Sequence, residues 1–194
     1  LCEEKDLLKH LTILITTDHG MTPFYGVSCL PDLIGRLKAV GLAAARPEER
    51  TEQTRVVALP YTIELSLYCA PDITQEEKDR IARVCGEAPY TDRLFGREEM
   101  QRDFGLDSRG PEFLVSPRYG SHFYHRDIPE DTFGAGHDSF HETSQHIFGL
   151  MLGGDIPPGT EFTQKTYGID LIPAIVRQRY GWTLNEERKS ELKL

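Results

Sequence analysis

The sequence predicts an α/β fold, and three segments indicate this class. Residues 11–16 form a short, nearly continuous apolar run rich in β-branched side chains. Such runs are typical of a strand that is buried on both faces of a parallel sheet. A helical pattern follows at 31–40, and a second apolar run spans 147–152. Together these segments predict strands and helices packed in layers.

The first part of the chain, residues 1–47, is expected to hold one strand and one helix. Leu33, Ile34, Leu37 and Val40 fall at helical spacing, which predicts an apolar helix face. Gly41 follows, and glycine is suited to the left-handed conformation that ends many helices.

The central part, residues 48–124, opens with a charged stretch that predicts a surface connection. Thr74 and Glu77 match a capping box, so a helix is expected to begin at residue 75. This mixture of elements predicts a small inserted α+β cap subdomain. The other elements expected here are strands at 56–59, 62–68 and 113–115, a short helix at 97–104, and a strand at 121–124 that pairs with 113–115.

The last part, residues 125–194, begins with a long loop at 127–139 and continues into the strand at 147–152. A final helix is expected to begin near 168–170, because Pro173 is tolerated only in a first turn. Residues 1–47 and 125–194 are therefore expected to form the α/β core, with 48–124 as the insertion.

Composition limits the classes of function. The 194 residues include 22 Lys and Arg against 31 Asp and Glu, which gives a net charge of -9. A broad basic surface for nucleic acid is therefore not expected. A phosphate substrate stays compatible with this charge, because bound metal ions reverse the local sign of an acidic site. No apolar run approaches the roughly 18 residues of a membrane span, so a soluble chain is predicted, with its compartment left open.

The four cysteines, at positions 2, 29, 69 and 85, form no CxxC pair and have no zinc-finger spacing. Cys69 ends an apolar run and Cys85 lies on a helical face, so both are expected to be reduced core residues. One disulfide is the alternative.

The first candidate site is the pair Asp18 and His19, which directly follows the first strand. Ligands in α/β sheets bind beyond the carboxyl ends of strands. A carboxylate beside an imidazole suits a divalent cation such as zinc. The alternative interpretation is that Asp18 caps a turn and His19 packs.

The second candidate site is the segment 134–142, Gly-Ala-Gly-His-Asp-Ser-Phe-His-Glu. His137 and His141 are four residues apart, so on a helix they would share one face and could hold a metal. Gly136 argues against a long helix there. The other histidines of this region, His122, His125 and His146, are interpreted as packing or surface residues.

Taken together, these segments resemble the alkaline phosphatase superfamily, in its type I phosphodiesterase/nucleotide pyrophosphatase branch. Residues 15–21, Ile-Thr-Thr-Asp-His-Gly-Met, are similar to that branch's SDHGM element. Residues 136–142 are similar to its GxHGSLHE element, and the strand at 147–154 with the segment 167–173 resembles the ending that follows it. The elements occur in the family's order and cover the first and last parts of the chain.

The resemblance implies an alkaline-phosphatase-like, mostly parallel sheet flanked by helices, incomplete here and carrying the α+β insertion. It implies the C-terminal half of a catalytic domain with two divalent metal ions, zinc most often and manganese or magnesium otherwise. Asp18 and His19 would bind one metal ion and His137 the other. The remaining ligands and a Thr or Ser nucleophile would lie upstream of Leu1. No catalytic nucleophile is therefore expected in this chain, and the chain alone is expected to be inactive.

The implied activity is metal-dependent hydrolysis of a phosphodiester, pyrophosphate or phosphonate, with a small-molecule substrate. Asp138 stands where the family has glycine, and its carboxylate could orient His137, with His141 as a further supporting residue. The alternatives are a non-catalytic fragment that binds a metal or a partner, a sulfatase or phosphoglycerate mutase relative, and an α/β domain without metal. An incomplete sheet would also expose an apolar edge and favour homo-oligomers.

Overall fold

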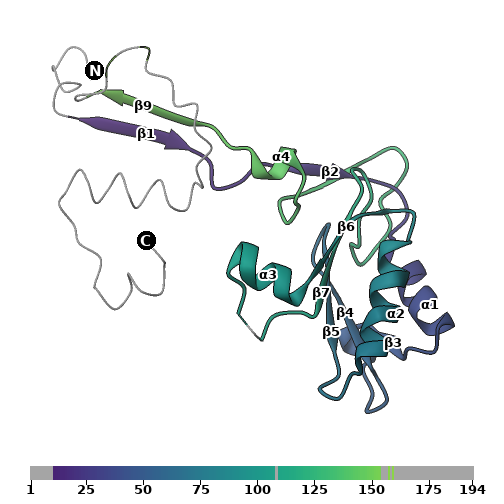
Figure 1. Cartoon of the computed structure of the whole chain (residues 1–194). Coiled ribbons are helices and arrows are strands. Elements are labelled where there is room, and N and C mark those ends of the chain that lie inside the picture. Colours follow the sequence, from purple (N-terminus) through teal and green to yellow (C-terminus); the bar gives the residue numbers. More distant parts are fainter. Residues whose placement is uncertain (1–10, 108, 154–156, 158, 160–194) are drawn as a thin grey trace. The chain divides into compact units, whose positions relative to one another are not determined.

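A computed structural model of the chain describes residues 11–107, 109–153, 157 and 159. The chain divides into two compact units, one of residues 19–146 and the other of residues 1–18 with 147–194 (Figure 1). No helix within the described ranges combines the length and the hydropathy that a bilayer crossing requires. The two units are described one after the other.

The larger unit is built on a five-stranded sheet with the strand order β3-β4-β5-β7-β6. Strands β3 and β4 are parallel, and the other three pairings are antiparallel. Helices α1 and α2 cover one face and α3 lies on the other (Figure 1). The bounds are β3 Ala44–Ala45, β4 Val56–Pro60, β5 Leu65–Cys69, β6 Thr91–Gly96, β7 Phe113–Pro117, α1 Leu30–Ala39, α2 Gln75–Gly86 and α3 Arg97–Phe104, with a 3-10 turn at Pro47–Glu49.

The main core lies between this sheet and helices α1 and α2. Alternate residues of the central strands point to it, such as Leu65 and Leu67 of β5, and both are fully buried. Leu37 of α1 and Cys85 of α2 close it from the helix side. The expected apolar helix face is therefore confirmed as a core face for Leu33, Ile34 and Leu37. It is wrong for Val40, which caps the end of α1 and is exposed.

The opposite face of the sheet carries a smaller aromatic cluster. Phe95 of β6 is fully buried, and its ring centroid lies 5.5 Å from that of Phe104 of α3 and 4.6 Å from that of Phe140. Phe140 belongs to the segment that the sequence marks as the second candidate site. This cluster therefore attaches the candidate segment to the sheet.

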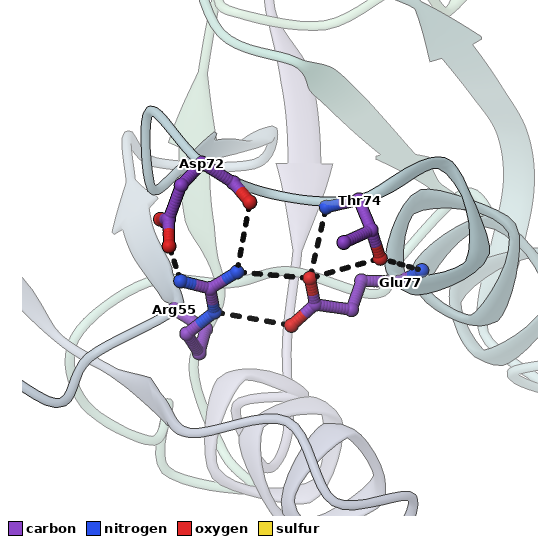
Figure 2. A network of polar contacts seen from close by, with 4 residues as sticks. All are labelled: Arg55, Asp72, Thr74 and Glu77. Atoms are coloured by element: carbon purple, nitrogen blue, oxygen red, sulfur yellow. Dashed lines mark hydrogen bonds and ion pairs between the residues drawn. The ribbon is translucent and has the colours of Figure 1, made fainter.

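The capping box at the start of α2 is confirmed. The backbone N–H of Glu77 donates to Thr74 Oγ1 at 3.2 Å, and Glu77 Oε2 accepts from the backbone N–H of Thr74 at 2.9 Å. Arg55 adds a forked pair of hydrogen bonds to the Glu77 carboxylate, at 3.0 and 2.9 Å, and two more to Asp72, one to its carboxylate and one to its backbone carbonyl (Figure 2). The guanidinium of Arg55 lowers the pKa of Glu77 to about 2.

Several other expected elements are confirmed, but the strand expected at 62–68 begins only at Leu65, and a further expected strand is not formed. The helix at 97–104 has the expected bounds, and Gly41 follows α1 with a φ of 81°. The strand expected at 121–124 is wrong, because this segment is irregular and is held instead by the hydrogen bond from the backbone N–H of Cys29 to the carbonyl of His122. His122 itself is fully buried.

A two-stranded antiparallel sheet joins the two candidate segments inside the larger unit. Strand β2, Thr22–Phe24, pairs with β8, Gly134–Gly136, and Thr22 lies opposite Gly136. The loop expected over 127–139 therefore contains a short strand. A one-turn helix, α4, spans Glu142–Gln145.

The described part of the smaller unit is a ribbon of two strands. Strand β1, Thr12–Thr16, pairs with β9, Gly149–Gly153, and the pairing is antiparallel. The expectation of a fully buried parallel position for the first apolar run is therefore wrong for the described residues. Ile15 and Leu150 remain 45% and 47% exposed on this ribbon, because one partner strand covers neither face. Self-association through this surface stays a prediction.

Three further expectations concern positions that the structure describes only in part. The final helix near 168–180 lies outside the described residues. Cys69 and Cys85 are free thiols, as expected, with Cys85 buried and Cys69 half-buried; Cys29 is also a free thiol, and Cys2 lies outside the described residues. The insertion at 48–124 stays a prediction, and α1, which precedes it, shares its core with β4, β5 and α2.

The expectation of a nucleophile upstream of the chain is a separate matter. Leu1, the residue before which the Thr or Ser was expected, lies outside the described residues, as do residues 2–10. The fold of the described residues does not test this expectation, and it stays a prediction.

Candidate functional site

The structure brings together two of the predicted metal-binding residues, His19 and His137. Their imidazole rings stack with a centroid distance of 4.0 Å and an angle of 19° between the ring planes. His137 is exposed and His19 is half-buried. The two residues come from distant parts of the sequence, so the pair is a product of the tertiary structure.

The segment around His19 is fixed by contacts with α4. The backbone N–H of Gly20 donates to the carbonyl of Ser144 at 2.9 Å. The buried Thr22 hydroxyl lies 2.7 Å from Thr143 Oγ1 and 2.6 Å from Ser144 Oγ. A side chain at position 20 would overlap the Thr143 carbonyl, so this close approach requires glycine.

A hydrogen bond sets the tautomer of the His19 ring. Nδ1 lies 2.8 Å from the carbonyl oxygen of Gly20, and a carbonyl oxygen only accepts, so Nδ1 carries the proton. In an imidazole with a single proton, on Nδ1, the lone pair lies on Nε2. Metal-binding histidines commonly use this arrangement, in which one ring nitrogen donates to a backbone carbonyl and the other binds the ion.

The carboxylate of Asp138 fixes the segment around His137. Its Oδ2 accepts hydrogen bonds from the backbone N–H groups of Thr62, Ile63 and Glu64, at 2.8, 2.9 and 3.3 Å. These groups belong to the turn between β4 and β5. The residue that departs from the family pattern therefore ties the His137 loop to the sheet, and its expected action on the His137 ring stays a prediction.

The side chain of Glu64 makes the opposite connection, from the turn between β4 and β5 back to the segment that carries His137. Its Oε1 accepts from Ser116 Oγ at 2.8 Å and from the backbone N–H of Phe140 at 3.1 Å. Its Oε2 is buried without a hydrogen-bond partner among the described residues. Burial raises the pKa of Glu64 to about 8, with a smaller contribution from the charge of Asp138. We refer to Asp138 and Glu64 with these contacts as the carboxylate clasp.

Sequence analysis missed Glu64. The available signal was an acidic residue between Ile63 and Leu65 in an apolar run, a position at which a charge is costly unless it is paired. The residue that it contacts could not be found from the pattern, because Phe140 lies far along the chain.

The raised pKa of Glu64 predicts a specific dependence of stability on pH. The folded pKa of about 8 exceeds the ordinary value of 4.5, so the folded state binds the extra proton between these values. The favourable contribution is fully present below about pH 4.5 and is lost as the pH rises through about 8. In this window the free energy of unfolding should fall by on the order of 1 kcal/mol per pH unit from this group.

Urea unfolding of Glu64→Gln between pH 5 and 9 checks this dependence. The variant should lose the slope that Glu64 contributes, while Glu87→Gln, an exposed glutamate at the end of α2, should keep the wild-type slope. Equal slopes in wild type and Glu64→Gln would contradict the assignment.

His141 does not join the histidine pair through a helix. Helix α4 begins after it, so His137 and His141 do not share a helix face. The Nε2–H of His141 donates to the carbonyl of Pro117 at 2.9 Å, and its ring meets the edge of Tyr119. The contact that His141 makes is thus with the end of β7.

Asp18 precedes His19 directly in the sequence and is the last residue of its segment of the smaller unit. Its side chain is exposed, and its Oδ1 accepts from Thr17 Oγ1 at 3.4 Å. Within the described residues, no group of three or more His, Cys, Asp or Glu side chains is arranged to hold a metal ion. Imidazole is a ligand type that zinc accepts, and the assignment of His19 and His137 as metal ligands stays a prediction.

The fold defined by these elements is alkaline-phosphatase-like, a mixed α/β arrangement in which helices flank a sheet. The predicted α/β class with helices flanking a sheet is confirmed. The expected mostly parallel sheet is wrong for the described strands, because only β3 and β4 pair in parallel and the other named pairings are antiparallel. No protein-family model and no curated protein matches the chain.

The solved structures that are similar in fold to this chain include two proteins. They are phosphonoacetate hydrolase from Sinorhizobium meliloti, in complexes with phosphonoformate and with phosphonoacetate, and human ectonucleotide pyrophosphatase/phosphodiesterase 5. The hydrolase complexes give TM-scores of 0.54 and 0.55 at 16% identity, and the alignment covers 82% of this chain and 40% of the hydrolase. The human protein gives a TM-score of 0.52 at 14% identity, over 91% of this chain and 42% of its own. The chain thus spans about 40% of the length of these structures.

Proposed function

We propose that this chain forms part of a metal-dependent hydrolase of phosphoric or phosphonic esters, to which it contributes metal-binding residues. The stacking of His19 on His137 carries the proposal, because two imidazoles from separate motifs meet at one place. The similar structures support it, since their names describe a phosphonoacetate hydrolase and a nucleotide pyrophosphatase/phosphodiesterase.

In this proposal His19 and His137 act as metal ligands, with Asp18 as a third. The proton on Nδ1 of His19 directs Nε2 to the metal ion, and the Gly20 carbonyl holds the ring in that orientation. The carboxylate clasp holds the loop that carries His137 against the sheet. The chemistry that a pair of divalent ions would supply here, zinc in the first instance, is stabilisation of the charge on the attacking and leaving oxygens at phosphorus. The hydroxyl nucleophile, a Thr or Ser, would come from residues that precede Leu1.

Zinc titration of the chain tests the ligand assignment without relying on turnover. We expect weak zinc binding by the wild type, measured by calorimetry and by the NMR signals of the histidine rings. His19→Ala and His137→Ala should each weaken zinc binding by about tenfold or more, the scale found when groups at a metal site are lost.

His125→Ala is the matched control, because His125 is exposed and its ring contacts that of Tyr124 rather than the histidine pair. It should bind zinc within about twofold of the wild type. Equal zinc affinity in all four proteins would overturn the proposal, and so would loss of affinity in His125→Ala alone.

A second candidate function is a non-catalytic module that binds a metal ion or a partner. The observation in its favour is that the described residues form no cluster of three potential ligands. Turnover separates the two candidates. In a longer protein that contains these residues with a nucleophile, His137→Ala should abolish phosphodiester hydrolysis if the chain is part of an enzyme.

A further inference from the structure

A cavity of about 590 Å³ opens beside β8 in the larger unit. Its volume lies within the range of small-molecule sites. Three aromatic side chains line it, those of Phe24, Tyr124 and Phe133, and Arg126 is the one cation among the lining residues. Polar and aromatic groups that converge on one cavity are typical of a binding site for a small organic molecule.

The aromatic groups are arranged to receive a ring. The Phe24 and Tyr124 rings lie 5.9 Å apart at an angle of 60°, and Phe24 is buried. Gly134 lets the Phe24 ring lie against the backbone of β8, because a Cβ at this position would overlap that ring. Phe133 contributes a side chain that is 71% exposed. Covering this ring with the ring of a ligand removes apolar surface from water, which favours binding.

Arg126 gives the cavity a preference for an anion. Its guanidinium lies 5.6 Å from the centroid of the Tyr124 ring, and Arg126 forms no ion pair within the described ranges. The one acidic lining residue, Asp127, already accepts a hydrogen bond from the backbone N–H of Ser28 at 2.9 Å. In a chain of net charge -9, this cation is available to attract a negatively charged ligand.

The cavity adjoins the candidate metal-binding loop. Ala135 lines it, and His137 follows two residues later, a spacing of about 7 Å along an extended chain. Thr62 lines it as well, and the backbone N–H of Thr62 is held by Asp138. We propose that this cavity binds the aromatic group of an aryl phosphonate or aryl phosphate ester, with the phosphorus atom toward His137. The inference rests on the proposed function for the role of the phosphorus atom, and on the cavity alone for the ring.

Calorimetric titration of the chain with phenylphosphonate and methylphosphonate, in buffer with a metal chelator, tests the ring site. Phenylphosphonate should bind at least about fivefold more tightly than methylphosphonate, the scale of an aromatic contact. Phe133→Ala should weaken phenylphosphonate binding by about three- to tenfold and leave methylphosphonate unchanged. Arg126→Gln should weaken the binding of both phosphonates by about two- to fivefold, because both are anions that the guanidinium attracts.

Phe148→Ala is the matched control, since Phe148 is also exposed, at 61%, but does not line the cavity. It should bind both phosphonates as the wild type does. Equal affinity for the two phosphonates, or an unchanged phenylphosphonate affinity in Phe133→Ala, would overturn the ring site. These titrations contain no metal ion. A negative result would therefore count against the ring site and not against zinc binding by the histidines.

Addition of zinc tests the orientation of the ligand. If the phosphorus atom lies toward His137, zinc should tighten phenylphosphonate binding by the wild type and have no such effect in His137→Ala. An unchanged phenylphosphonate affinity in a wild-type protein that has bound zinc would overturn the placement of an ester substrate in this cavity.

Discussion

Asp138→Ala should destabilise the larger unit by about 2–4 kcal/mol, because three backbone N–H groups lose their acceptor at once. Hydrogen bonds to a charged acceptor are stronger than those between neutral groups, and the turn at 62–64 offers these donors no other acceptor within its own strand pairing. Urea unfolding at constant pH measures the change.

The loss should also reach the histidine pair. Without the Asp138 contact, the His137 loop keeps the attachment of Phe140 to Glu64 and Phe95 and the contact of His141 with Pro117. We therefore expect the NMR signals of the His19 and His137 rings to shift toward those of exposed histidines. A merely local defect would leave these ring signals in place.

Two variants make the comparison specific. Asp138→Asn retains an acceptor oxygen of the same shape and should lose less than half of the stability lost by Asp138→Ala. Asp92→Ala removes an exposed aspartate of β6 and should change stability by no more than about 0.5 kcal/mol. If Asp138→Ala were as stable as Asp92→Ala, the three hydrogen bonds would not support the loop.

Gly20→Ala should separate the His19 and His137 rings and lower the free energy of unfolding by about 1–3 kcal/mol or more. The added Cβ would overlap the Thr143 carbonyl oxygen, and that atom belongs to the backbone and cannot rotate away. The hydrogen bond from Gly20 to Ser144 should be lost with it. Thermal or urea unfolding measures the cost, and the zinc titration of the variant should resemble that of His19→Ala.

Gly35→Ala is the control, because the same chemical change is made where there is room for it. Gly35 lies in α1, and no atom comes within 4 Å of the position of its added Cβ. Alanine is a better helix former than glycine, so the free energy of unfolding of this variant should rise by up to about 1 kcal/mol. A Gly20→Ala variant that unfolds at the same urea concentration as the wild type would show that the contact with Thr143 can relax.

The elements that the sequence predicted well are those whose causes are local. The capping box of Thr74 and Glu77 sets the start of α2 through contacts three residues apart, and the glycine after α1 ends that helix in a left-handed conformation. The two candidate motifs could also be recognised from sequence alone, since a motif is defined by the order of its residues along the chain.

Tertiary structure decided the features that depend on distant partners. Whether β1 lies in a parallel sheet or pairs with β9 depends on which strands meet, because an apolar run of five residues is compatible with either. The partner of Asp138 is likewise a turn 74 to 76 residues away. A sequence pattern contains neither fact.

By itself, the sequence predicted helices α1, α2 and α3, the strands β1, β4, β5, β7 and β9, the α/β class and the candidate ligands, but not β2, β3, β6, β8 or α4. Only the tertiary structure brought His19 to His137, revealed the buried Glu64 and formed the cavity beside β8. The physical reason is that propensity and capping act within a few residues, whereas burial and side-chain contact depend on how the whole chain packs.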